Sequence, residues 1–251
     1  MYQGTPVFIA RAVEMGKAVP LTGVMIVPTV PISPEPYASN HPGRMKKFPP
    51  EEELIIRAPT HSDSRPWRHE LNHDAESVFW LLFLWVVGAQ PTDRPSETIS
   101  PSPWVGLTDS VWSRVSLLKA LTAGEICSGT THSLYQPVQP LLIALAAVLV
   151  VDTFWLKESD TRNDPEYVCE AFQRLILQFL LNNDNEGFLR HEVGPHRREV
   201  GLLTQILSLT ETTAQRRSSG KRKSSPNMEQ QGQTRSRWAF PRLHASSSRA
   251  R

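Results

Sequence analysis

The sequence is poor in cysteine and has no apolar run long enough to cross a membrane. Cys127 and Cys169 are its two cysteines, too few for a disulfide framework or a four-cysteine metal site. We therefore expect a reducing, intracellular setting, cytoplasmic or nuclear. Residues 1–20 lack the basic start and apolar core of a signal peptide. The apolar runs at 78–87 and 141–151 fall short of the roughly 20 residues of a bilayer span, so no membrane contact is expected.

Strand signals are also scarce, which predicts a mainly α fold. Apolar residues make up 39% of the chain and prolines number 21, so part of the chain must be irregular. Residues 20–66 hold ten of these prolines. Because proline removes a backbone donor and disfavours helix before it, we expect a long, partly extended loop there, with one or two helical turns at 51–57. Residues 91–103 form a second proline-rich loop in this interpretation.

The net charge of +2 hides a division between an acidic body and a basic tail. Residues 212–251 carry a net charge of +9, and residues 1–211 carry −7. The tail is rich in Ser, Gln and Arg and nearly free of apolar residues, so we expect one domain at 1–210 and a disordered tail at 211–251. Basic clusters at 216–217 and 221–223 could serve nuclear import or contact nucleic acid. Outside the tail we do not expect nucleic-acid binding.

The sequence around residues 72–89 predicts a central helix. Asn72 is the expected N-cap, and Asp74 and Glu76 place negative charge in the first turn, where the helix dipole favours it. The run 78–87 has no polar face, whereas a surface helix shows one every 3.6 residues. We therefore expect this helix to be buried all round, with the other helices packed around it.

Further helices are predicted downstream of the central helix. They are 111–123, capped by Asp109 or Ser110; 140–156, with Pro140 at its first position; a helix begun by Asp164-Pro165-Glu166; and a short helix at 196–209. In the third of these, Val168, Phe172, Leu175 and Phe179 are expected to face inward. Glu170 and Arg174 are expected to form an outward i,i+4 pair.

Residues 69–73 read His-Glu-Leu-Asn-His, a match to H-E-x-x-H. On one helix, His69 and His73 could hold Zn²⁺ while Glu70 activates a bound water, which makes a zinc hydrolase one hypothesis. The motif lacks a third histidine at the short spacing, and Pro66 lies where the helix would have to begin. A polar lead-in to the buried helix is the alternative interpretation, and we favour it.

Three segments together resemble the fungal-type protein kinase family over roughly residues 1–195. They read G-T-P-V-F-I-A at 4–10, W-R-H-E-L-N-H-D-A-E-S-V-F-W at 67–80, and E-Y-V-C-E-A-F-Q-R-L-I-L-Q-F at 166–179. The first is similar to the end of the activation segment, the second to the start of the central C-lobe helix, and the third to a late C-lobe helix. The resemblance implies a protein-kinase-like C-lobe and, for the family, ATP-dependent phosphorylation of protein Ser or Thr.

The resemblance also implies roles for four residues. Gly4, Thr5 and Pro6 would belong to the substrate loop, with the Thr5 hydroxyl bonded to the catalytic-loop Asp and Gly4 allowing the tight turn beside it. Asp74 would hold the catalytic loop's backbone. Where kinases carry Ala-Pro-Glu this chain has Ala10-Arg11-Ala12, and Glu14 is the candidate replacement for the missing glutamate.

The motifs on the ATP side of a kinase are missing from this sequence. It has no G-x-G-x-x-G, V-A-I-K, His-Arg-Asp or Asp-Phe-Gly, and phosphoryl transfer needs the groups that these motifs supply. We therefore expect no catalytic residue and no cofactor in this chain; ATP and Mg²⁺ belong to a full-length family member. The hypotheses are a C-lobe fragment of a kinase, a non-catalytic module that binds protein partners or a substrate, and the zinc hydrolase.

Overall fold

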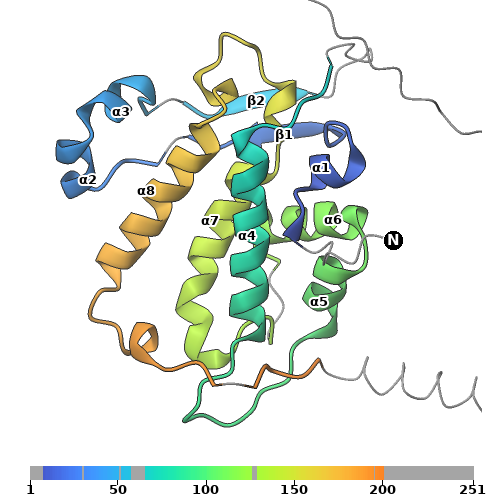
Figure 1. The fold of residues 1–251 in the computed structure, drawn as a ribbon, viewed down its shortest axis with the longest axis vertical. Helices are drawn as coiled ribbons and strands as arrows, with labels where there is room; N and C mark the ends of the chain where they lie inside the picture. The colour runs from blue at the N-terminus through green and yellow to red at the C-terminus, as the bar shows by residue number, and fades with distance from the viewer. Residues whose placement is uncertain are drawn as a thin grey trace, which may run out of the picture. The chain divides into compact units, whose positions relative to one another are not determined.

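The computed structural model describes residues 8–29, 31–50, 52–57, 66–125, 129–194 and 196–200, all within one unit, Met1–Ser208. The described chain is mainly helical with one small sheet, which confirms the expected mainly α class at that level (Figure 1). Its elements are α1 Arg11–Met15, β1 Val24–Val27, α2 Glu35–Asn40, α3 Pro42–Lys47, β2 Leu54–Arg57, α4 Leu71–Gly88, α5 Pro101–Thr108, α6 Val111–Thr122, α7 Gln139–Leu149 and α8 Tyr167–Asn182.

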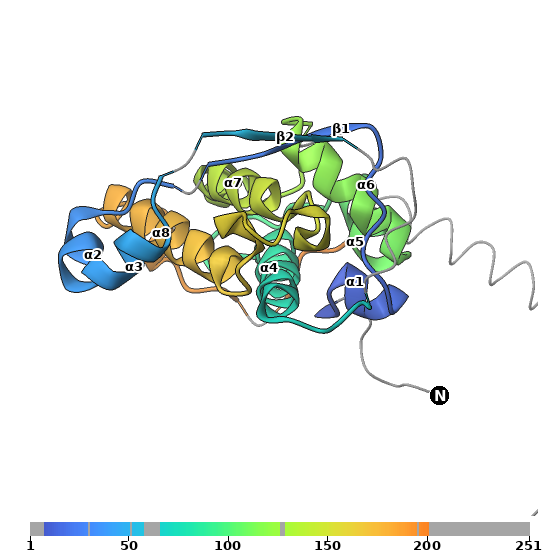
Figure 2. The same cartoon turned by 90° about the horizontal axis from the view of Figure 1, so that it is seen from above.

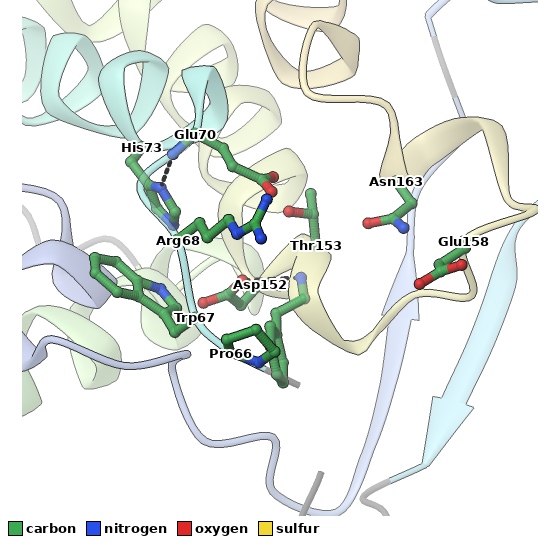
Figure 3. A pocket seen from close by; sticks show the side chains of 10 residues that line it. Pro66, Trp67, Arg68, Glu70, His73, Asp152, Thr153, Glu158 and Asn163 are labelled. Carbon is green, nitrogen blue, oxygen red and sulfur yellow. Dashed lines mark hydrogen bonds between the residues drawn. The ribbon is translucent and has the colours of Figure 1, made fainter. Parts of the chain in front are cut away.

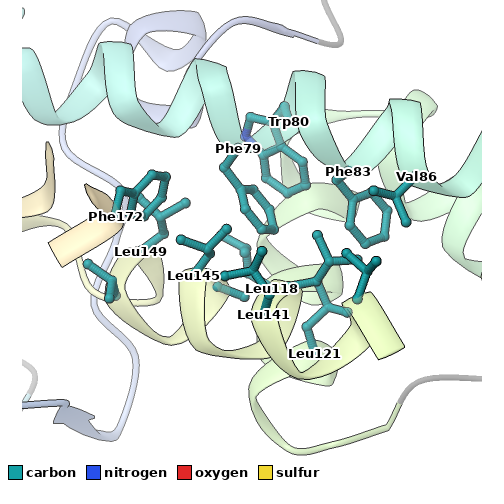
Figure 4. Packing of buried hydrophobic residues seen from close by; sticks show 14 of the residues in the cluster. Phe79, Trp80, Phe83, Val86, Leu118, Leu121, Leu141, Leu145, Leu149 and Phe172 are labelled. Atoms are coloured by element: carbon teal, nitrogen blue, oxygen red, sulfur yellow. The ribbon is translucent and has the colours of Figure 1, made fainter. Parts of the chain in front are cut away.

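The central-helix prediction is confirmed, with α4 starting and ending one residue earlier than expected. Helices α1, α5, α7 and α8 contact α4, and α6 packs against α5, α7 and α1 (Figures 1 and 2). Phe79, Trp80 and Phe83 project from α4 into a core shared with Leu118 of α6 and Leu145 of α7, and all five side chains are fully buried (Figure 4). This cluster joins the helices into a single hydrophobic core.

The prediction that α4 is buried all round is wrong along one stripe. Its exposed residues are Leu71, Asp74, Val78, Leu81 and Trp85, which recur at alternating spacings of three and four. That spacing keeps them on one line along the helix. Val78 is 55% exposed, Leu81 54% and Trp85 48%. The sequence did not predict this side, because a stretch with only apolar residues does not indicate which of its faces is exposed. We call these five residues the α4 stripe.

The long proline-rich segment contains more regular structure than its composition predicted. Strand β2 pairs antiparallel with β1, with Val24 opposite Arg57 and Val27 opposite Leu54. The expectation of helical turns at 51–57 is therefore wrong, because residues 54–57 adopt an extended conformation and form backbone hydrogen bonds with β1. Val27 in turn packs against Val151 and Leu156, beyond the end of α7, and this second small core holds the sheet on the helices.

One of the helix starts agrees with prediction, and two other helix boundaries differ from it. Ser110, one of the two predicted caps, accepts the N–H of Ser113 and starts α6 at the predicted residue. Helix α7 ends at Leu149 rather than 156, since Asp152 caps a separate 3₁₀ turn at Thr153–Trp155. Helix α5 begins at Pro101 inside the predicted second loop, where a proline in the first turn loses no helical hydrogen bond.

The expected outward pair on α8 lies inside the protein. Glu170 and Arg174 are 0% and 1% exposed, and Arg174 Nε donates to Glu170 Oε1 at 2.8 Å. Arg44 Nε and the Tyr37 hydroxyl donate to the other oxygen, Oε2. Segment α2–α3 covers this face of α8, and the arginines of that segment and of α8 share one buried carboxylate.

Among the residues that the structure describes, we find no helix with both the length and the apolar character of a membrane span. The predicted substrate-loop residues Gly4, Thr5 and Pro6 fall outside the described residues, as do the predicted tail at 211–251 and most of the predicted helix at 196–209.

Burial of the Glu170 network predicts a large loss of stability in Glu170→Ala. The substitution leaves the guanidinium of Arg174 buried without its carboxylate, which costs about 3–5 kcal/mol in the free energy of unfolding. Chemical denaturation monitored by circular dichroism measures this loss, with the exposed Glu186→Ala as control. A loss below about 1 kcal/mol, typical of a surface pair, would contradict the buried arrangement.

Candidate functional site

The amino-terminal end of α4 is where most of the singled-out residues meet. Glu70 is the N-cap: its side chain accepts the backbone N–H of His73, and its own N–H donates to His73 Nδ1 at 2.9 Å. This reciprocal pair is a capping box with the imidazole at the third position. Asn72, predicted as the cap, lies inside the helix and donates from Nδ2 to Thr153 Oγ1 at 2.7 Å.

Two ion pairs, one of them fully buried, hold α1 against this end of the protein. The backbone N–H and Nε of Arg11 donate to Glu76 Oε1 at 2.9 and 2.7 Å, and the indole of Trp80 donates to the same oxygen at 2.9 Å. Arg114 of α6 binds Glu14 and donates to the carbonyl of Ile9 at 2.8 Å. Glu14 therefore pairs with a buried arginine while remaining partly exposed itself, two residues after the position where kinases carry a glutamate.

Asp74, the predicted anchor of a catalytic loop, lies on the α4 stripe. Its side chain is 62% exposed, and Oδ1 is 3.3 Å from Nε2 of His69. At this end Glu76 accepts the backbone N–H of Arg11, the first residue of α1, and Asp152 accepts that of Val19 at 2.8 Å. Asp74 was predicted to hold the backbone of a catalytic loop, but this chain lacks the His-Arg-Asp motif of that loop. The role of Asp74 therefore stays a prediction.

The H-E-x-x-H motif does not lie on one helix. Helix α4 begins at Leu71, so His69 precedes it, and the rings of His69 and His73 stack with centroids 5.5 Å apart. Nδ1 of His73 is already engaged by the N–H of Glu70. Across the described ranges, no three His, Cys, Asp or Glu side chains are grouped as metal ligands.

A cavity of about 170 Å³ opens beside the capping box (Figure 3). Figure 3 shows Trp67 and His73 on one side of this space, Asn163 and Glu158 on the other, and Asp152 between them. The remaining lining residues are Pro66, Arg68, Glu70, Thr153 and Phe154. We call this space the α4-mouth pocket. Segments 66–73 and 152–163, far apart in sequence, build it together.

Burial shifts the pKa of both ionisable groups at the base of this pocket. Desolvation lowers the pKa of His73, although the charge of Asp152 opposes the shift. Desolvation likewise raises the pKa of Asp152, against the hydrogen bonds from the N–H groups of Val19 and Phe154. In the sequence Asp152 only follows the apolar run at 141–151, and its partner Val19 lies too far away in sequence to be foreseen.

Comparison of this chain with models of protein families, with curated proteins and with solved structures found no match.

The lowered pKa of His73 predicts that this residue makes the fold less stable in acid. The unfolded state takes up a proton on this residue near pH 6.5 while the folded state stays neutral, so the free energy of unfolding falls as pH drops below 6.5. The slope from one such proton is at most about 1.4 kcal/mol per pH unit. Urea denaturation at stepped pH measures it, and His73→Asn should remove that part of the slope.

His69→Asn is the matched control, because His69 is exposed and precedes the helix. Equal slopes in the wild type and His73→Asn would show that His73 protonates alike in the folded and unfolded states. That result would contradict the burial of this imidazole.

Proposed function

We propose that this chain is the C-terminal-lobe portion of a fungal-type protein kinase fold and acts, by itself, as a non-catalytic module that binds a partner helix along α4. The observation that carries the proposal is the α4 stripe. The central helix of the core leaves Leu71, Val78, Leu81 and Trp85 about half exposed. An exposed apolar patch of this kind marks an interaction site.

The spacing of the stripe favours a helix as the partner. Residues that recur at alternating steps of three and four form the seam of paired helices, where each side chain inserts between residues of the facing helix. Leu82 and Ser77, beside the stripe, are half-buried and extend the surface around the seam. Asp74 lies on the same line, so a segment seated on the stripe would also reach its carboxylate.

The order of elements supports the kinase-like part of the proposal. A short helix, α1, follows the Gly-Thr-Pro segment, a long connection leads to the central helix α4, and α8 carries the late segment of the resemblance. Glu14 bound to Arg114 supplies a carboxylate near the position where the family's Ala-Pro-Glu ends. None of these features supplies a catalytic group, and the proposal for this chain is therefore binding.

We expect no saturable binding of MgATP. The sequence lacks the Gly-rich loop, the strand lysine and the Asp-Phe-Gly aspartate that hold the phosphates and Mg²⁺. Thermal unfolding with and without MgATP measures this, with an intact fungal-type kinase as the positive control. A concentration-dependent rise in Tm that saturates would overturn the non-catalytic assignment.

The α4 stripe is tested as a docking surface by mixing this chain with a second polypeptide and measuring their binding. The probe is the amino-terminal half of an active fungal-type kinase, from its Gly-rich loop through Asp-Phe-Gly, made as a separate polypeptide. We expect it to bind this chain in analytical ultracentrifugation. Leu81→Arg should weaken binding about tenfold or more, because it places an uncompensated charge in an apolar seam.

Trp112→Arg provides the matched control, since Trp112 is 54% exposed on α6 and lies off the stripe. Equal binding by the two variants would exclude the stripe as the docking face. Absence of binding by the wild type would exclude the kinase-like partner.

A further inference from the structure

The α4-mouth pocket contains two buried N–H donors that have no hydrogen-bond partner among the described residues. They are Nε1 of Trp67 and Nε2 of His73. Their rings lie 5.6 Å apart between centroids, and both line the pocket. A buried donor without an acceptor costs roughly 1–3 kcal/mol, so two in one cavity point to an occupant that accepts from both.

The tautomer of His73 follows from its other nitrogen. Nδ1 accepts the N–H of Glu70 at 2.9 Å, so the neutral imidazole carries its proton on Nε2. The residue is 5% exposed, and its fixed Nε2–H is unsuited to act as a general base. The pocket therefore offers two pre-positioned donors and binds an acceptor atom.

The charged residues that line the pocket indicate whether its ligand is an anion, a cation or a neutral group. Glu70, Asp152 and Glu158 place three carboxylates around it, against the one guanidinium of Arg68. An anion would meet this negative surplus, and a cation would leave both donors unpaired. A neutral carbonyl group avoids both costs, and an N–H on the same group can donate to the carboxylates.

We propose that the α4-mouth pocket is a binding site for a neutral amide group, with the carbonyl oxygen accepting from Trp67 Nε1 and His73 Nε2. Asp152, Glu158 or the Asn163 side chain accepts the amide N–H. The volume of about 170 Å³ lies below the roughly 300–1,000 Å³ of sites for drug-sized ligands, so it suits a single amide group. This proposal does not rest on the proposed binding of a partner helix at the α4 stripe.

The test uses acetamide and acetate, a neutral amide and an anion of nearly the same shape. Each is titrated into the full ¹⁵N-labelled chain at constant ionic strength, and the indole N–H resonance of Trp67, assigned with Trp67→Phe, is followed by NMR. We expect a saturable downfield shift of this resonance with acetamide. Acetate should bind at least about tenfold more weakly, as expected for an anion among three carboxylates.

Trp67→Phe keeps an aromatic side chain but removes the N–H donor together with the five-membered ring of the indole. Acetamide binding, followed at the backbone amide of Thr153, should therefore weaken about three- to tenfold. Trp112→Phe, which alters an exposed indole on α6, should bind as the wild type does. Acetate binding as tightly as acetamide would overturn the amide assignment. A non-saturating response shared by all indoles would show that water alone serves the two donors, and would also overturn it.

Discussion

The buried carboxylate of Glu76 joins α1 to α4. It accepts from the backbone and guanidinium of Arg11 on α1 and from the indole of Trp80 on its own helix. A buried charge is tolerated only when it is paired and fully hydrogen-bonded, so the position of α1 against α4 is fixed within narrow limits. Arg11 also donates to the carbonyl of Leu149, which ties the end of α7 to the same point.

The same constraint organises the polar residues elsewhere in the core. Glu170 on α8 collects Arg174, Arg44 and Tyr37, while Arg198 near the end of the described chain donates to five backbone carbonyls. Each network links segments more than 100 residues apart in sequence. The helices are thus held together by buried charges with many partners as well as by the aromatic cluster of α4.

One end and one side of α4 depart from this complete pairing. At its amino-terminal end, the indole of Trp67 and the imidazole of His73 have unpaired N–H groups. Along one side, Val78, Leu81 and Trp85 remain half exposed. Most of the remaining residues of the helix are buried. The two exceptions are therefore the places where binding of another group has the most to gain, the first through hydrogen bonds and the second through apolar contact.

Local sequence located the longer helices, while α2, α3 and α5 lie in segments predicted as loops. The apolar run after residue 77 predicted α4, Ser110 predicted the start of α6, and proline predicted the first turn of α7, because caps and periodicity act within a few residues. Tertiary structure alone decided which faces are covered. Glu170 and Arg174 resemble a surface pair until α2 and α3 pack over them, and an all-apolar helix does not indicate its open side. Asp152 and Trp67 acquire their roles only when segments some 85 residues apart in sequence meet at the mouth of α4.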